Sequence, residues 1–271
     1  MTFSRRYVLA IGLLLCGSPL VQGAEPASPT GSVSVAPAAA EIIRKMLDTD
    51  TWGLGEAEVS ARAIIKDDRG GQRELAFSAR SRRHAPPLTK SLVRFRAPAD
   101  LAGVGFLQIQ KAEDDDDRYL FLPELGKARR IAGNTRGSAF MGTDFTYADL
   151  DRRDLREGTA VLKGQEDVGK FPCFRLEVTP KRADSPYARL EIWVRSDNFV
   201  PLKTLMYNRA GVLLKTLVTL ELRRIEGRWF LTRSRMTDHA AGRTTELLLD
   251  NITPKSDIPD EEFTVRNLEK N

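Results

Sequence analysis

The 271-residue sequence predicts a mainly β (α+β) fold, built on one large, curved antiparallel sheet. Apolar and polar residues alternate along most of the chain after Gly53, which is the period of a half-buried strand. The connections between these runs are too short for helical crossovers, so neighbouring strands must be antiparallel. A long twisted sheet must cover its apolar face or curl around it, and few helical segments exist to cover it. We therefore expect a half-open barrel with a few short helices as its lid.

Residues 1–23 predict a removable export signal. Arg5 and Arg6 precede an apolar run from Val8 to Leu15, and Gly23 stands directly before the expected cut. The apolar run is shorter than the roughly 20 residues that span a bilayer. We therefore expect an exported, periplasmic protein. Ser4 and the two arginines also approximate the twin-arginine pattern, which leaves that export route open beside the general secretory one.

Residues 24–38 are rich in Pro, Ser, Gly, Val and Ala without periodicity, which predicts a flexible linker. Helical spacing begins after it, where Ile42, Ile43 and Met46 lie on one face, and predicts a helix from about 38 to 48. The rest of the chain is long enough for a large core, and residues 39–271 are expected to form a single domain.

The alternating runs begin with a hairpin, at about 57–63 and 75–80, around a turn from Asp67 to Gly71. Further strands are expected at about 88–96, 104–110, 118–123, 127–132, 158–165, 171–179, 187–195, 202–208, 212–224, 228–238 and 243–253. Thr146 with Asp149 three residues on predicts the start of a short helix, and one helical turn is expected after Pro259.

The most distinctive stretch runs from Arg118 to Leu150. It holds an "LP" strand, a basic "RRI" strand and an "FMGTDF" segment followed by Tyr147, Asp149 and Leu150. On these motifs the chain resembles the outer-membrane lipoprotein-sorting (LolA-like) family. The resemblance implies a half-open barrel whose concave face holds acyl chains, and hence a carrier.

Alternation along the strands indicates which apolar residues face the concave side. A filled core is the alternative reading, because inward apolar stripes usually pack against one another. The resemblance requires several of them to line a space instead, where Met and Phe suit an aliphatic ligand. The expected ligand-binding residues are Phe106, Phe121, Phe174, Leu176, Leu190, Ile192, Met206, Leu220, Phe230 and Met236.

Polar groups are expected at the mouth or lid of the cavity. Arg129 and Arg130 point to opposite faces of one strand, so one of them should face inward, where an unpaired charge is costly. Asp144 is a candidate partner. The pair would either fix the loop as a structural ion pair or contact an anionic headgroup and help close the lid.

No pattern in the sequence indicates catalysis. Neither His84 nor His239 stands in a metal-ligand spacing, no nucleophile elbow occurs, and Cys173 lies in an apparent strand as expected of an inert buried thiol. No cofactor, metal or enzymatic activity is expected. The excess of 42 Lys and Arg over 37 Asp and Glu is small and scattered, which argues against nucleic acid.

Two classes of function remain open. The first is a periplasmic carrier, expected to be a monomer, that binds lipoprotein acyl chains or another phospholipid-like ligand and moves it towards the outer membrane. Because no nucleotide-binding loop occurs, an inner-membrane transporter is the expected partner. The second is a non-catalytic accessory or assembly module of an envelope lipid transporter, with a filled core.

Overall fold

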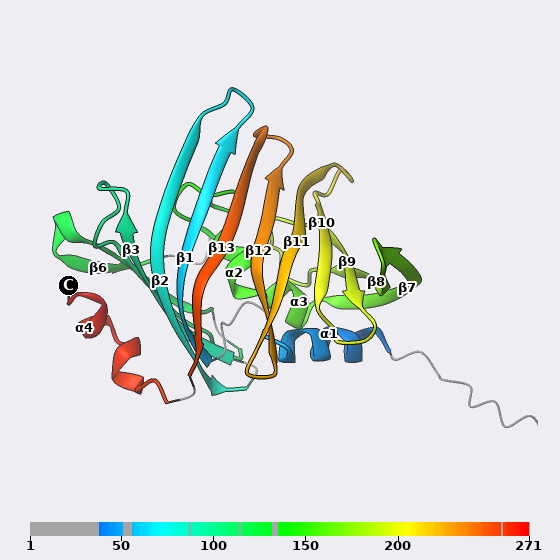
Figure 1. The fold of residues 1–271 in the computed structure, drawn as a ribbon, viewed down its shortest axis with the longest axis horizontal. Helices are drawn as coiled ribbons and strands as arrows, with labels where there is room; N and C mark the ends of the chain where they lie inside the picture. The colour runs from blue at the N-terminus through cyan, green and yellow to red at the C-terminus, as the bar shows by residue number, and fades with distance from the viewer. Residues whose placement is uncertain are drawn as a thin grey trace, which may run out of the picture. The chain divides into compact units, whose positions relative to one another are not determined.

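Thirteen antiparallel strands form one sheet in the part of the chain that this computed structural model describes, residues 38–50, 56–86, 88–113, 115–131, 135–255 and 257–270 (Figure 1). The strands are β1 (Glu56–Asp67), β2 (Gln72–Ala85), β3 (Leu88–Ala97), β4 (Gly105–Ile109), β5 (Asp117–Leu122), β6 (Lys127–Arg130), β7 (Thr159–Val168), β8 (Phe171–Thr179), β9 (Arg189–Arg195), β10 (Pro201–Tyr207), β11 (Leu213–Ile225), β12 (Arg228–Asp238) and β13 (Arg243–Pro254).

The sheet consists of two meanders joined at their centre. Strands β1 to β6 pair in sequence towards one edge, and β13 back to β7 pair in sequence towards the other. The pair β1·β13 joins the two halves, with Ala57 opposite Pro254 and Asp67 opposite Arg243. The two edge strands, β6 and β7, do not pair with each other, so the sheet is curved but not closed.

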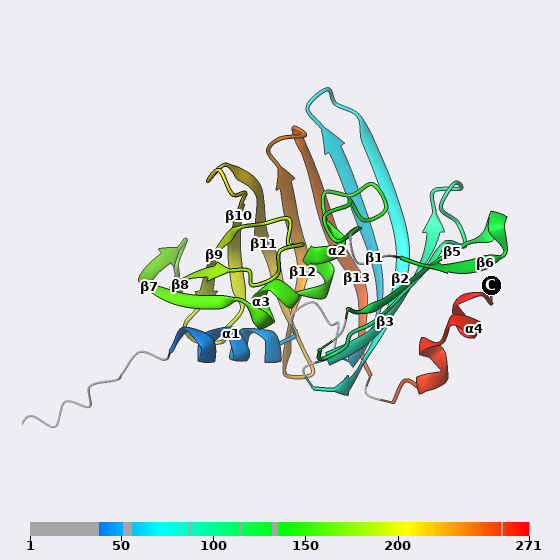
Figure 2. The ribbon, with the colours of Figure 1, turned by 180° about the vertical axis from the view of Figure 1, so that it is seen from behind.

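Short helices and a long connection lie against one face of this sheet, which we call the concave face (Figure 2). These helices are α1 (Ala39–Asp48), α2 (Tyr147–Asp151) and α3 (Arg153–Glu157). The helix α4 (Val265–Leu268) and the 3-10 turn η3 (Asp260–Phe263) pack on the opposite face, and the 3-10 turn η1 (Pro123–Leu125) precedes β6. We use "lid" for α1 together with residues 135–157. Ile42, Ile43 and Met46 of α1 are buried against Leu176 and Ile192 of the sheet, as their helical spacing requires.

The helix α2 begins at a complete capping box. The Thr146 hydroxyl accepts a hydrogen bond from the Asp149 backbone N–H, and the Asp149 carboxylate accepts one from the Thr146 N–H at 2.7 Å. These bonds satisfy donors that a helix of only five residues would otherwise leave open. They fix the place where the lid turns back over the sheet.

A second apolar core lies under the C-terminal segment. Ile258, Phe263 and Leu268 pack on Leu107 and Phe121 of the sheet. Gly105 is needed there, because a Cβ at this position would lie 2.6 Å from the Leu268 side chain. The sheet is therefore covered on both faces over β3–β5, so a buried residue of these strands can lie on either face.

The expected open, curved antiparallel sheet with few helices is confirmed. The expected first helix, the Thr146 helix and the turn after Pro259 are present as α1, α2 and η3. Helices α3 and α4 were not expected. The predicted export signal (1–23) and linker (24–38), apart from Ala38, lie outside the described residues. Within the described part of the chain, no helix has the length and hydrophobicity needed to cross a membrane.

Candidate functional site

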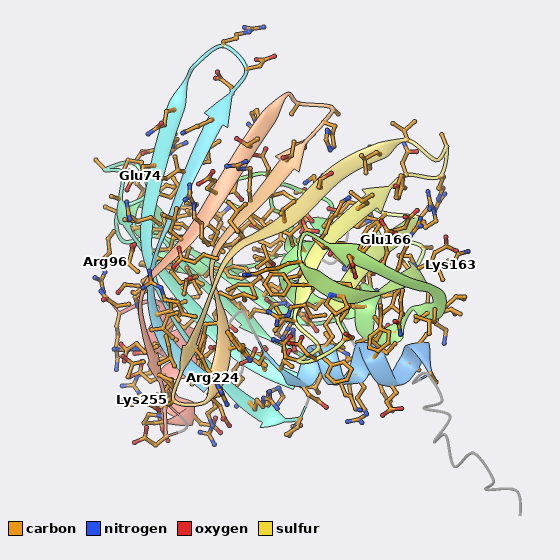
Figure 3. The ribbon with its side chains drawn as sticks, turned by 45° about the vertical axis from the view of Figure 1, so that its right-hand side comes forward. Glu74, Arg96, Lys163, Glu166, Arg224 and Lys255 are labelled. Atoms are coloured by element: carbon orange, nitrogen blue, oxygen red, sulfur yellow. The ribbon has the colours of Figure 1, made fainter. Side chains whose placement is uncertain are left out.

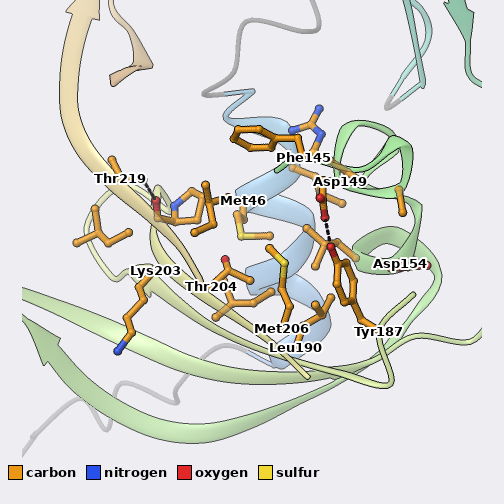
Figure 4. A pocket seen from close by; sticks show the side chains of 18 of the residues that line it. Met46, Phe145, Asp149, Asp154, Tyr187, Leu190, Lys203, Thr204, Met206 and Thr219 are labelled. Carbon is orange, nitrogen blue, oxygen red and sulfur yellow. Dashed lines mark hydrogen bonds between the residues drawn. The ribbon is translucent and has the colours of Figure 1, made fainter. Parts of the chain in front are cut away.

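Two apolar cavities lie between the lid and the concave face. Cavity I, of about 90 Å³, lies beneath α1 and α3 and is walled by residues of β9–β11 such as Leu190, Ile192 and Met206 (Figure 4). Cavity II, of about 120 Å³, lies over β1–β4 and β13. Both are lined mainly by carbon, as expected of a site for an apolar ligand.

The shape of cavity II follows from the residue sizes along the central strands. Ala61 and Ala63 of β1 and Ala79 of β2 present only methyl groups to it. Larger rings close it from the β3–β4 side and from the lid, with Phe106 and Phe140 in edge-to-face contact at 5.1 Å between centroids. Small residues facing large ones thus leave space where a uniform row of large side chains would fill it.

Three lid residues, Phe145, Asp149 and Arg152, line both cavities and stand between them. The Asp149 carboxylate accepts a hydrogen bond from the Tyr187 hydroxyl at 2.9 Å, and Figure 4 shows these two side chains meeting at the edge of cavity I. Burial raises the pKa of Asp149 above its ordinary value, although Lys215 and the hydrogen bonds from Thr146 and Tyr187 oppose this. The residues between the cavities therefore include an apolar ring, that of Phe145, and a buried acid, Asp149, that accepts hydrogen bonds.

Asp144 fastens the lid to the sheet. Its buried carboxylate accepts hydrogen bonds from Arg243, at 2.8 Å from Nη2, and from the Thr245 hydroxyl at 2.7 Å. The Asp144 N–H donates to the same hydroxyl, and the Asp144 carbonyl accepts from Lys215 Nζ at 2.6 Å. We call this set the Asp144 latch, because it ties the "FMGTDF" segment to β11 and β13.

A second anchor holds the other part of the lid. Arg136, whose side chain is buried, donates to Asp154 of α3 and to Asp184, each at 3.1 Å. The Ser185 hydroxyl donates to the other oxygen of Asp154 at 2.6 Å. A hydrogen bond from Arg182, followed by the charge of Arg136, holds the pKa of Asp184 below its ordinary value. The lid is thus fixed by charged groups at two points, with the cavities between them.

Seven of the ten expected cavity residues line one of the two cavities or belong to the core cluster beside cavity I. Phe106 lines cavity II, and Leu190, Ile192 and Met206 line cavity I. Phe174, Leu176 and Met236 belong to the same core cluster as the walls of cavity I but lie behind them. Whether any of these side chains contacts a ligand stays a prediction.

The other three residues lie elsewhere. Phe121 faces the C-terminal segment on the opposite face, because both faces of β5 are covered and hydrophobicity alone does not identify the inner one. Leu220 is 40% exposed, because the residues of β11 that line cavity I are Leu217 and Thr219, and alternation turns Leu220 to the other face. Phe230 is buried against Val59, Ala61 and Leu249 without reaching either cavity.

The predicted pairing of Arg129 or Arg130 with Asp144 is wrong. Both arginines are exposed, because β6 is an edge strand with solvent on both faces, so neither is forced inward. Arg130 pairs with Asp117, and Asp144 pairs with Arg243 instead. Neither arginine lines cavity I or cavity II.

Sequence reasoning did not identify Phe145, Asp149 or Arg152 as cavity residues. The capping box gave Asp149 a purely local role, and the sequence carries no sign of its contact with Tyr187, 38 residues away. Arg152 has a left-handed backbone, with φ of 52°, and is the single residue between α2 and α3. Such a conformation in a residue other than glycine is a frequent mark of a functional position, but only coordinates show it.

The described residues offer little for covalent or metal chemistry. Cys173 is fully buried, burial raises the pKa of its thiol, and no three His, Cys, Asp or Glu side chains in the described ranges are grouped to hold a metal ion. Charge is spread around the periphery, as Figure 3 shows for Glu74, Arg96, Lys163, Glu166, Arg224 and Lys255.

Known proteins of the same fold include lipoprotein-sorting proteins. A putative outer membrane lipoprotein-sorting domain from Vibrio parahaemolyticus is 25% identical, with 86% of this chain and 98% of that one covered and a TM-score of 0.80. A DUF1329 family protein from Desulfovibrio piger is 27% identical, with 85% and 97% covered and a TM-score of 0.78. A LolA superfamily protein from Nitrosomonas europaea is 22% identical, with 84% and 98% covered and a TM-score of 0.68.

Sequence comparison adds the family itself. A search of curated proteins gives no match. A family model whose description reads "-like: Uncharacterized protein" matches residues 88–270, which include the lid segment, the Asp144 latch and most of the sheet. The chain therefore belongs to the family of that model, and its fold is that of the outer membrane lipoprotein-sorting and LolA superfamily proteins.

Proposed function

We propose that this protein is a periplasmic carrier that binds lipoprotein acyl chains or another lipid between its lid and its concave face, for transfer towards the outer membrane. The observation that carries the proposal is the pair of apolar cavities separated only by Phe145, Asp149 and Arg152. The likeness to a lipoprotein-sorting domain over nearly the whole of that chain supports the same class of function.

The sizes of the cavities indicate how a ligand would enter. A cavity of about 150 Å³ holds a molecule of the size of benzene, and neither cavity I nor cavity II is larger than about 120 Å³. A long acyl chain therefore requires the lid to move away from the sheet. Displacement of Phe145 and its neighbours would join the two cavities into one groove along the concave face.

Filling cavity II tests the proposal without adding a charge to the core. Ala79 lines the cavity, and Ala79→Phe would occupy it with a ring. We expect the variant to fold, with a cost of about 1–3 kcal/mol for tight packing, and to copurify with less lipid. Native mass spectrometry after gentle purification measures the bound lipid, and thermal melting on the same sample reports folding.

Leu220→Glu is the matched control. Leu220 is exposed and lines neither cavity, so a charge there should leave both the lipid content and the fold unchanged. A folded Ala79→Phe protein that carries as much lipid as the wild type would contradict the placement of the ligand in cavity II. Wild-type protein that never carries lipid would contradict the carrier itself.

The second candidate function is an accessory or assembly module of an envelope transporter. The small size of both cavities favours it, since a module that binds only proteins needs no ligand space. In that case the purified wild-type protein would contain no lipid, and Ala79→Phe would not reduce its activity in the cell.

The proposed carrier function also implies where the protein works and which partners it has. An exported protein with the fold of lipoprotein-sorting proteins is expected to work in the periplasm, as a monomer that receives its ligand from an inner-membrane transporter. Fractionation of cells and sequencing of the mature N-terminus test the location. An uncleaved, membrane-bound product would contradict export with cleavage near Gly23.

A further inference from the structure

Cavity II changes from apolar to polar along the strands that form its floor. One cross-strand row consists of Ala79, Val93 and Phe106, on β2, β3 and β4. The adjacent row, two residues and about 7 Å further along the strands, consists of Ser81, Ser91 and Gln108. All six side chains line the cavity. The Gln108 amide donates to Asp116 at 3.0 Å and the Ser81 hydroxyl to the Ala57 carbonyl at 3.5 Å, so the row is part of the structure, and it gives this end of the cavity a polar floor.

The polar row leads to a group of arginines. The next residue of β2 on the same face is Arg83, which lies opposite Thr89 and donates to the Asp48 carbonyl at the end of α1 at 3.0 Å. Asp50, two residues further on, lies 3.7 Å from Arg152 Nη2. Arg152 itself lines cavity II, so its cationic end stands where the polar row ends.

Arg152 forms one ion pair among the described residues. Its side chain is only 15% exposed, and among the described residues its partner is the Asp50 carboxylate, at a distance too long for a hydrogen bond. A guanidinium carries five N–H donors in a planar fork that suits the two oxygens of a carboxylate or phosphate. An anion entering from cavity II would satisfy donors that Asp50 does not reach.

The local charge balance favours such an anion. Arg83 and Arg156 both act on Arg152 with repulsive charge, and Arg228 donates to Asp50 at 3.2 Å. Asp50 would therefore keep Arg228 as its partner if Arg152 turned to a ligand. Burial, followed by these like charges, holds the pKa of Arg152 below its ordinary value, which an added anion would reverse.

Asp149 is the carboxylate that also lines cavity II. Both of its oxygens are occupied, one by the Tyr187 hydroxyl at 2.9 Å and the other by the Thr146 N–H at 2.7 Å. Burial raises its pKa above the ordinary value, although the charge of Lys215 opposes this. The hydrogen bonds from Tyr187 and Thr146 offset part of the repulsion between Asp149 and a bound anion.

We propose that cavity II binds an amphiphile with an anionic headgroup, a carboxylate or a phosphate, with its headgroup on Arg152, its polar link along Ser81, Ser91 and Gln108, and its chain against Phe106 and the alanines of β1 and β2. This inference rests on the proposed carrier function and specifies its ligand class. It distinguishes such a ligand from one whose chains end in neutral ester or amide groups, which would leave Arg152 with Asp50 alone.

Calorimetric titration with three probes of equal chain length tests the inference on delipidated, full-length protein at neutral pH. Dodecanoate and dodecyl phosphate carry the two anionic headgroups, and dodecanol carries none. We expect both anions to bind wild-type protein roughly tenfold or more tightly than dodecanol, the gain of one charge-assisted hydrogen bond. The tighter of the two anions identifies the source, a fatty acid or a phosphate headgroup.

Arg152→Gln should reduce the affinity for both anions roughly tenfold or more and change that for dodecanol little. Arg152→Lys, which keeps the charge, should recover part of the loss. Arg223→Gln, which removes an arginine 61% exposed on β11, is the matched control and should bind like wild type. Thermal melting of each variant confirms that it is folded.

Equal binding of dodecanol and the two anions by wild-type protein would overturn the headgroup inference, even if Arg152→Gln failed to fold, and would leave the carrier function intact. Anion binding that Arg152→Gln retains in full would overturn it as well. If none of the three probes binds and no lipid copurifies, the carrier function fails and the inference fails with it.

Discussion

At the scale of single residues, two of the three residues that line both cavities, Asp149 and Arg152, are ionisable, and burial shifts the pKa of each. Asp149 is the clearest case, because burial raises its pKa above 3.8 in the folded protein. An acid with a raised pKa in the folded state contributes stability that is fully present below its ordinary pKa and is lost as the pH rises through the raised value. The ionised form of Asp149 therefore weakens the lid.

The variant Asp149→Asn should reveal this titration, because an amide resembles the neutral acid at every pH and can still accept the Thr146 hydrogen bond. We expect the stability of the variant relative to wild type to increase as the pH rises above 3.8. Urea unfolding at a series of pH values measures the difference. A relative stability that falls with rising pH would mean that the charge of Lys215 stabilises ionised Asp149 more than burial penalises it.

Cys173 provides a residue-scale prediction of the opposite kind, an inert group. Its thiol is fully buried, donates to the Phe171 carbonyl at 3.4 Å and has a pKa raised by burial. Cys173→Ser should cost about 1 kcal/mol at most, because a hydroxyl can make the same bond, and should leave lipid binding unchanged. Loss of binding at an unchanged melting temperature would indicate a role for the thiol. Native wild-type protein should also resist thiol reagents until it unfolds.

At the scale of the elements, the Asp144 latch decides whether the lid segment stays on the sheet. Asp144→Ala would remove the carboxylate that Arg243 and the Thr245 hydroxyl contact in a buried site, while the bond from Lys215 to the backbone carbonyl would remain. Because Arg243 is partly exposed and can regain water, we expect a cost of about 1–3 kcal/mol rather than that of a fully buried pair. Hydrogen exchange of the amides from residue 140 to 150 should accelerate more than that of the strands.

Asp250→Ala is the matched control for the latch. Asp250 accepts two hydrogen bonds from Arg62 on the exposed side of the neighbouring strands, so its loss should cost less than about 1 kcal/mol and leave exchange in the lid unchanged. Equal effects of the two substitutions on the lid amides would show that Asp144 does not hold it.

The strands and helices also show which features of the fold can be predicted from the sequence. Alternation located the strands and predicted their antiparallel pairing, and helical spacing located α1, because these signals are local. The same alternation assigned Leu220 to the wrong face, because the residues of β11 that line cavity I, Leu217 and Thr219, are no more apolar than Val218 and Leu220 on the outer face. The prediction for Arg129 and Arg130 failed for a different reason, since the position of β6 at the edge depends on the order of all thirteen strands in the described residues.

At the scale of the whole molecule, apolar residues of the concave face both form the core and line the two cavities. Phe121 shows why hydrophobicity cannot separate these roles, because it is as buried as Phe106 but packs under the C-terminal segment. Cavity II remains where small residues of β1 and β2 face the large rings of β3, β4 and the lid, and cavity I lies beneath α1 and α3 against β9–β11. The lid must therefore close over little space when no ligand is present.

This closure predicts a specific response to ligand length. A ligand that binds only the folded state stabilises it by mass action, so dodecanoate should raise the melting temperature of the protein. Because neither cavity exceeds about 120 Å³, the same ligand must displace the lid to enter. Hydrogen exchange should therefore become faster in α1–α3 while it becomes slower in the central strands β1, β2 and β13. A short-chain acid such as butyrate, which fits without displacement, should leave exchange in the lid unchanged. Uniform slowing of exchange in lid and strands with dodecanoate would mean that the chain binds outside the two cavities.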